Sequence, residues 1–85
     1  MHEYHVVDAL VKQVTAKAAE HKAGKVAVVR LVLTDDSGFD PGSIRLYFSQ
    51  IAAQTSAADA QLSFETVKRS SPGQPALAIK EIEVE

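Results

Sequence analysis

Residues 25–33, KVAVVRLVL, are the stretch of sequence that decides the fold. Their β-branched side chains predict a strand. Alternation places Ala27, Val29, Leu31 and Leu33 on one face and Val26, Val28, Arg30 and Val32 on the other. Both faces are largely apolar, and such a strand is either central in its sheet or partly covered by a partner. We therefore expect the other elements to assemble around this strand.

Two amphipathic helices flank this strand in the sequence. Residues 4–22 carry apolar side chains at helical spacing, and we expect Gly24 to end that helix in a left-handed conformation. The second helix is predicted over residues 41–54, with Asp40 as its N-cap and Pro41 at the first helical position. The two apolar stripes comprise Val7, Leu10, Val11, Val14 and Ala18 in the first helix and Ile44, Tyr47, Phe48 and Ile51 in the second.

The rest of the sequence predicts two more strands, at residues 61–68 and 76–85, which we expect to pair as a hairpin through residues 69–75. The element order is then α-β-α-β-β. Two helices packed on one face of a three-stranded sheet make a two-layer α+β domain. The opposite sheet face is left open as a candidate partner surface. The apolar residues expected there are Val26, Val28 and Val32.

The last predicted strand changes phase part-way along. Leu77 and Ile79 fall on one face, whereas Ile82 and Val84 fall on the opposite one. A regular strand cannot bury both sets on the same side. We therefore expect a bulge near Lys80 and Glu81, or a strand that is covered on both faces at different points.

The composition is that of a single globular domain. The chain has 85 residues, of which 46% are hydrophobic and 24% charged, and its net charge is −2. This charge disfavours nucleic-acid binding, which usually needs a basic face. The sequence has no cysteine, so disulfides, thiolate zinc sites and thiol nucleophiles are excluded. Its apolar runs are too short to span a membrane, and the charged start without an apolar signal core predicts a cytoplasmic location.

The first five residues, MHEYH, could bind a metal. A free α-amine, backbone nitrogens and the His2 imidazole can enclose Ni(II) or Cu(II) in fused chelate rings with square-planar geometry. Glu3 supplies a backbone nitrogen, and its carboxylate can support the site from outside. His5 lies one helical turn further on and is an additional candidate ligand. Spacing alone equally fits a polar helix start, in which the helix dipole favours Glu3.

No catalytic constellation can be assembled from the sequence. Asp35 and Asp36 are adjacent but lie in a predicted turn, and Ser37 and Ser43 have no base nearby in the sequence. The glycines of residues 38–42 do not match a phosphate-binding loop. We therefore expect a protein that is not an enzyme, and a small hydrolase is the least favoured class.

Several separate stretches together resemble the HypA/HybF family. They are the MHE start, VRLVL, SGFDPGSIRLYF, SAADAQLSFETV and IKEIEVE, and they follow the family's order over nearly the whole chain. These proteins deliver nickel for the maturation of nickel–iron hydrogenase and, in some organisms, urease. The resemblance implies that Met1, His2 and Glu3 hold Ni(II) through the His2 imidazole and main-chain nitrogens. It also implies docking to a HypB-type GTPase and to the hydrogenase large subunit.

One departure from the family is large. Family members carry a zinc domain, held by two Cys-x-x-Cys pairs, where this chain has only the connection at residues 69–75. No structural zinc is therefore expected. The short connection fits a naturally reduced family member or engineered removal of the zinc domain. We expect residues 1–85 to form a single nickel-binding-type domain that acts as a metallochaperone. The alternative is a metal-independent interaction module that retains the fold but has lost metal delivery.

Overall fold

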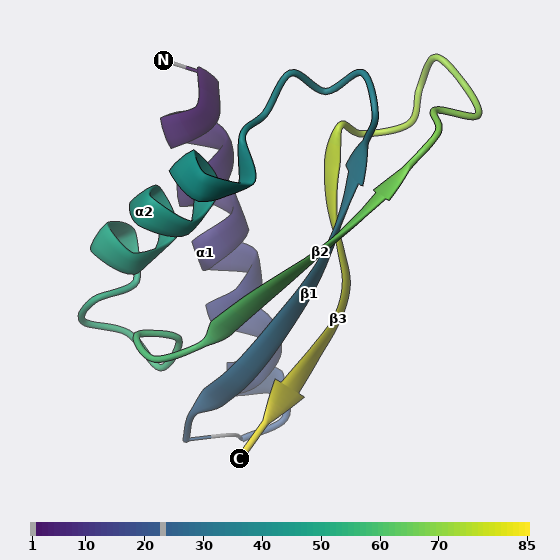
Figure 1. Cartoon of the computed structure of the whole chain (residues 1–85). Coiled ribbons are helices and arrows are strands. Elements are labelled where there is room, and N and C mark those ends of the chain that lie inside the picture. The colour runs from purple at the N-terminus through teal and green to yellow at the C-terminus, as the bar shows by residue number, and fades with distance from the viewer. Residues whose placement is uncertain (1, 23) are drawn as a thin grey trace.

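The computed structural model describes residues 2–22 and 24–85, with the backbone alone for His2. Its helices are α1 (His2–Glu20) and α2 (Pro41–Ile51), and its strands are β1 (Val26–Thr34), β2 (Gln61–Val67) and β3 (Leu77–Val84). Both helices lie on one face of the three-stranded sheet (Figure 1). The predicted two-layer α+β fold with the order α-β-α-β-β is confirmed.

Strand β1 occupies the centre of the sheet, as its two apolar faces predict. The strand order is β2-β1-β3, with β2 parallel and β3 antiparallel to β1. The prediction that the last two strands pair as a hairpin is wrong, because they lie on opposite edges of β1. Helix α2 carries the chain back along the sheet, so β2 runs parallel to β1, and the remaining edge of β1 is taken by β3. Residues 69–75 therefore connect the two edges of the sheet.

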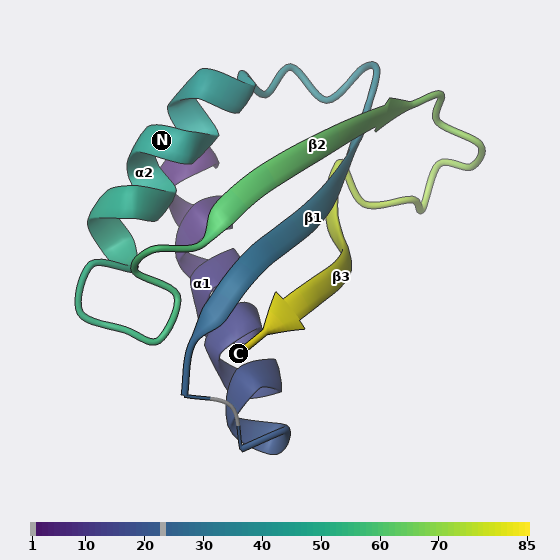
Figure 2. The same cartoon turned by 60° about the horizontal axis from the view of Figure 1, so that its bottom comes forward.

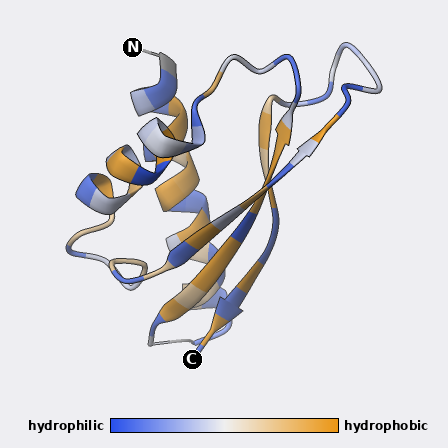
Figure 3. Ribbon diagram, viewed as in Figure 1, coloured by the Kyte–Doolittle hydropathy of each residue, from blue (hydrophilic) through white to orange (hydrophobic). Residues whose placement is uncertain are grey.

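The core lies between the helices and the sheet. The predicted stripe of α1 is confirmed, since its five apolar residues are at most 4% exposed. Helix α2 buries Ile44 and Phe48 fully and packs Tyr47 and Ile51 partly against them. Figure 3 shows hydrophobic residues along both helices and along the strands. The residues that β1 contributes to the core are Val26, Val29, Leu31 and Leu33.

The bulge expected in the last strand is present. Arg30 of β1 pairs with Glu81, whereas the next residue, Leu31, pairs with Ile79, so Lys80 is the extra residue. One inserted residue reverses the side-chain phase of the strand beyond it. All three apolar residues of β3 that pack against the core can therefore lie on one face. They are Leu77, Ile79 and Ile82.

A second bulge, in β1, corrects the prediction for the open sheet face. The register shifts between Val26 and Val28, which leaves Ala27 as the extra residue. Val26 is thereby turned into the core, where it is 0% exposed. The prediction that it lies on the open face is wrong for this reason. Val28 and Val32 are half-buried.

The helix ends also differ from their predicted positions. Helix α1 ends at Glu20, and the residue with a left-handed backbone is Lys22, with φ of 55°, rather than Gly24. Beyond Ala18 no helix residue is buried, so packing does not extend the helix toward the glycine. Helix α2 begins as predicted, with Asp40 as N-cap and Pro41 following. It ends at Ile51, three residues early, and Thr55 then bonds the Ala52 carbonyl in a tight turn.

Candidate metal centre

The residues predicted to hold metal stand at the start of α1. Met1 lies outside the described residues, as does the side chain of His2, whereas Glu3 and His5 are described. The first four N–H groups of a helix have no acceptor within that helix. The backbone nitrogens of His2 and Glu3 are among these four, because α1 begins at His2. They are therefore free of intrahelical hydrogen bonds.

The Glu3 carboxylate is anchored to the beginning of α2. Its Oε2 accepts a hydrogen bond from the backbone nitrogen of Asp40 at 2.9 Å. Asp40 is also the N-cap of α2, since its side chain accepts a hydrogen bond from the backbone nitrogen of Ser43 at 3.3 Å. The sequence indicated the capping role but not the contact with Glu3. The contact fixes the first turn of α1 against α2.

A second link to α2 runs through aromatic rings. The rings of Tyr4 and Tyr47 meet edge to face, with centroids 5.7 Å apart and planes at 75°. The Tyr4 ring also meets the ring of His5 edge to face, with centroids 6.2 Å apart. Tyr47 belongs to the half-buried face of α2, whereas His5 is exposed. His5 thus lies beside an aromatic ring and remains accessible to solvent.

The described side chains do not by themselves make a metal site. Among residues 2–22 and 24–85, no group of three or more His, Asp or Glu side chains lies close enough together to hold an ion. The set implied by the sequence instead uses the α-amine of Met1, the His2 imidazole and main-chain nitrogens, and its side-chain donors fall outside the described part. The assignment of Met1, His2 and Glu3 therefore stays a prediction.

Asp36, in the turn that follows β1, has a structural role. The Arg69 Nε contacts both carboxylate oxygens of Asp36, at 3.0 and 2.8 Å, and its Nη2 lies 3.4 Å from the Thr34 hydroxyl. The same guanidinium donates to the Gln74 carbonyl. Hydrogen bonding to Arg69 holds the pKa of Asp36 below its ordinary value of 3.8. Arg69 thus ties the connection between β2 and β3 to the turn after β1.

No helix within the described residues is both long and apolar enough to cross a bilayer.

Comparison with known proteins identifies relatives of the sequence. The model of the HypA family, described as hydrogenase/urease nickel incorporation metallochaperones, matches residues 1–72. The hydrogenase maturation factor HypA of Dehalococcoides mccartyi is 33% identical over 67 residues, which cover 79% of this chain and 56% of the relative. HypA of Caldanaerobacter subterraneus is 32% identical over 68 residues, which cover 80% and 60%. The chain thus spans a little over half the length of the curated relatives that it matches.

Solved structures share the fold. The solution structure of the nickel metallochaperone HypA from Helicobacter pylori superposes with a TM-score of 0.81 and 15% identity, and covers 96% of each chain. A second solution structure of a HypA protein gives a TM-score of 0.68 and 18% identity, over 100% of this chain and 92% of the other. At these identities the likeness shows the common fold and nothing further about the site.

Proposed function

Because the chain belongs to the HypA family of nickel-incorporation metallochaperones, we propose that it binds Ni(II) at its N-terminus and passes the metal to a nickel enzyme, mainly nickel–iron hydrogenase. The family description is that of a metallochaperone and not of an enzyme. Nickel is accordingly the cargo of the chain. No structural zinc is proposed, since the sequence has no cysteine.

The proposed donors are the α-amine of Met1, the His2 imidazole and the main-chain nitrogens of this segment, including that of Glu3. Four nitrogens in a plane suit Ni(II). The observation that carries this proposal is the hydrogen bond from the Asp40 nitrogen to the Glu3 carboxylate. That hydrogen bond ties the first turn of α1 to the N-cap of α2, and it therefore supports a fixed course for the main chain whose nitrogens are the proposed donors. His5 is proposed only as an additional ligand.

A delivery protein must also release its metal. The proposed site stands at the first turn of α1, where Tyr4 and His5 are exposed. Ligands next to such exposed residues can be exchanged one at a time, without opening a folded cage. A buried site would hinder transfer. This position therefore supports delivery rather than permanent storage.

The proposed partners follow from the family. They are a HypB-type GTPase and the hydrogenase large subunit, in the cytoplasm. Neither nucleic acid nor a membrane is part of the proposal. We further propose that residues 1–85 act as one nickel-binding-type domain, with the connection at residues 69–75 where the family carries its zinc domain.

Calorimetric titration of untagged protein with nickel, combined with absorption spectroscopy, tests the proposal. We expect one site with the spectrum of planar nickel, and its affinity should rise with pH because coordinating amides lose protons. His2→Ala and an acetylated N-terminus should each abolish that site. His21→Ala is the matched control, since His21 is exposed near the other end of α1. Binding that persists in both altered proteins would overturn the proposal and favour a metal-independent interaction module.

A further inference from the structure

The two edges of the sheet differ in how open they are to another strand. Strand β3 has two shifts of register against β1 and carries the charged residues Lys80, Glu81 and Glu83. Strand β2 pairs with β1 without a shift from Gln61 to Val67, and Glu65 is its one charged residue. Bulges and charges are the usual means by which proteins prevent strand addition at an edge. The edge formed by β2 is therefore the less protected one.

The outer side of β2 has backbone groups that another chain could bind. Residues of a strand alternately direct their N–H and C=O groups toward the neighbouring strand and away from it. Across the described residues, no backbone hydrogen bond joins the Leu62–Thr66 stretch to a segment other than β1. The Leu62 carbonyl instead accepts a hydrogen bond from the Arg45 Nη2 at 3.1 Å. A side chain of α2 thus covers part of this edge.

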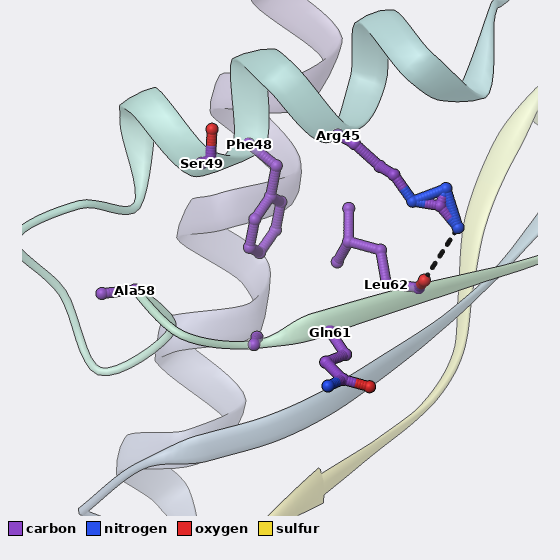
Figure 4. A pocket seen from close by; sticks show the side chains of 7 residues that line it. Arg45, Phe48, Ser49, Ala58, Gln61 and Leu62 are labelled. Atoms are coloured by element: carbon purple, nitrogen blue, oxygen red, sulfur yellow. Dashed lines mark hydrogen bonds between the residues drawn. The ribbon is translucent and has the colours of Figure 1, made fainter.

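A pocket lies between α2 and this edge. Helix α2 runs beside β2 (Figure 2). The pocket has a volume of about 370 Å³, and its lining includes Arg45 and Phe48 of α2 and Leu62 of β2. Figure 4 shows Phe48 and Leu62 reaching from the two elements toward the space between them, with Arg45 bridging to the strand. The space therefore offers an apolar floor beside a strand edge.

The pocket and the adjoining edge of β2 form a groove between α2 and β2, and the charge of this groove is positive. Among the residues that line the pocket, Arg45 alone carries a charge. Its guanidinium stands 4.8 Å from the centroid of the Phe64 ring, and its side chain is exposed. The carboxylate of Glu65 is bound by Lys80 at 2.9 Å. A ligand in the groove therefore meets an exposed arginine whose hydrogen-bond partner, the Leu62 carbonyl, lies on the same strand edge.

We propose that the groove between α2 and β2 binds an extended, acidic segment of a partner protein, which adds as a strand alongside β2. Groove-bound peptides of this kind obtain affinity from main-chain hydrogen bonds and specificity from alternate side chains. The Arg45 guanidinium leaves the Leu62 carbonyl and binds a carboxylate of the ligand, and that carbonyl then accepts a ligand N–H. An apolar side chain of the ligand fills the pocket over Phe48. This inference goes beyond nickel delivery and does not depend on it.

Three end-blocked heptapeptides with alternating valines provide the test. Their other positions carry glutamate, glutamine or lysine, and each peptide is titrated into isotope-labelled full chain while backbone amide shifts are recorded. We expect the glutamate peptide to shift amides of residues 61–67 and to bind about fivefold more tightly than the glutamine peptide, the size of an exposed ion pair. Arg45→Gln should remove that preference. Arg30→Gln is the matched control, because Arg30 pairs with Glu83 on β3, and it should leave the preference intact.

Three results of the peptide titrations would overturn the inference. They are shifts that map away from β2, a lack of binding by any of the peptides at millimolar concentration, and equal affinities for the three charges. Concentration-dependent self-association that protects the β2 amides and is not displaced by peptide would overturn it too, and would assign the edge to a second copy of the chain. Nickel titration of Arg45→Gln should match the wild type, so the two proposals fail independently.

Discussion

The Oε2 atom of Glu3 lies 2.9 Å from the backbone nitrogen of Asp40, although 37 residues separate them in the sequence. This hydrogen bond joins the first turn of α1 to the N-cap of α2. Glu3 is half-buried and Asp40 exposed, so the contact forms at the surface edge of the domain. The orientation of the segment that we propose as the nickel ligand set therefore depends on how the two helices pack.

Removal of the Glu3 carboxylate should weaken nickel binding without abolishing it. Glu3→Ala keeps the main-chain donor but frees the first turn, so we expect a loss of about three- to tenfold in nickel affinity, in line with one partly exposed hydrogen bond of about 1 kcal/mol. Glu3→Gln retains an acceptor for the Asp40 nitrogen and should bind nearly as well as the wild type. Calorimetric titration measures both, with the exposed Glu20→Gln as control. Wild-type affinity in Glu3→Ala would show that the contact does not position the ligands.

The ring pair of Tyr4 and Tyr47 should be energetically coupled. Edge-to-face pairs contribute about 0.5–1.5 kcal/mol beyond the area that they bury. Because Tyr4 is 43% exposed, we expect the lower half of that range. A double-mutant cycle with Tyr4→Leu and Tyr47→Leu, measured by urea unfolding, gives the coupling directly. Tyr4→Leu combined with Leu46→Ala is the control cycle, since Leu46 is 56% exposed on the same helix, and its two effects should be additive.

The sequence pattern was sufficient to predict the elements that are determined by residues close together in the sequence. The stripe of α1 repeats every three or four residues, and Asp40 followed by Pro41 is an ordinary helix start, so both helices were predicted to within a few residues. The bulge at Lys80 is one of the two outcomes that the sequence predicted, because Leu77 and Ile79 are out of phase with Ile82 and an inserted residue reconciles them.

The features that the sequence predicted wrongly or missed are those that depend on tertiary packing. A turn-rich connection is typical of a hairpin. The structure instead pairs β3 with the free edge of β1, and no local signal in the sequence predicts that pairing. The bulge at Ala27 lies in a stretch that is apolar on both faces, so the hydrophobic pattern of the sequence does not reveal the shift in side-chain phase that the bulge causes. The contact of Glu3 with Asp40 depends on how α1 packs on α2, and the sequence alone does not predict that packing.

The pair of Asp36 and Arg69 should make stability depend on pH in the acid range. The folded-state pKa of Asp36 is lowered, chiefly by its hydrogen bond with Arg69, so the folded protein favours the ionised carboxylate. The stabilisation is therefore complete above about pH 5 and is lost as the pH falls through the lowered pKa. Urea unfolding should show Asp36→Asn less stable than the wild type at pH 7, with the two curves converging toward pH 2.

The exposed pair of Asp59 and Lys25, whose charged atoms lie 3.4 Å apart, provides the control. Asp59→Asn should change stability little at either pH, because exposed pairs contribute little. A difference between Asp36→Asn and the wild type that stays constant from neutral to acid pH would contradict the linkage. It would mean that the substitution acts through local packing instead.

Substitution of Asp40 can separate its two roles. The side chain caps α2 through the Ser43 nitrogen at 3.3 Å and the Ser43 hydroxyl at 3.1 Å, whereas the backbone nitrogen serves Glu3. Asp40→Ala removes the cap and keeps the N–H, so it should lower the free energy of unfolding by about 1 kcal/mol. Nickel affinity of the folded protein should change less than in Glu3→Ala, and Asp40→Asn, which can still cap, should be close to wild type in both measurements. If Asp40→Ala instead loses as much nickel affinity as Glu3→Ala while Asp40→Asn does not, the side chain of residue 40 and not its main chain holds the N-terminal segment in place.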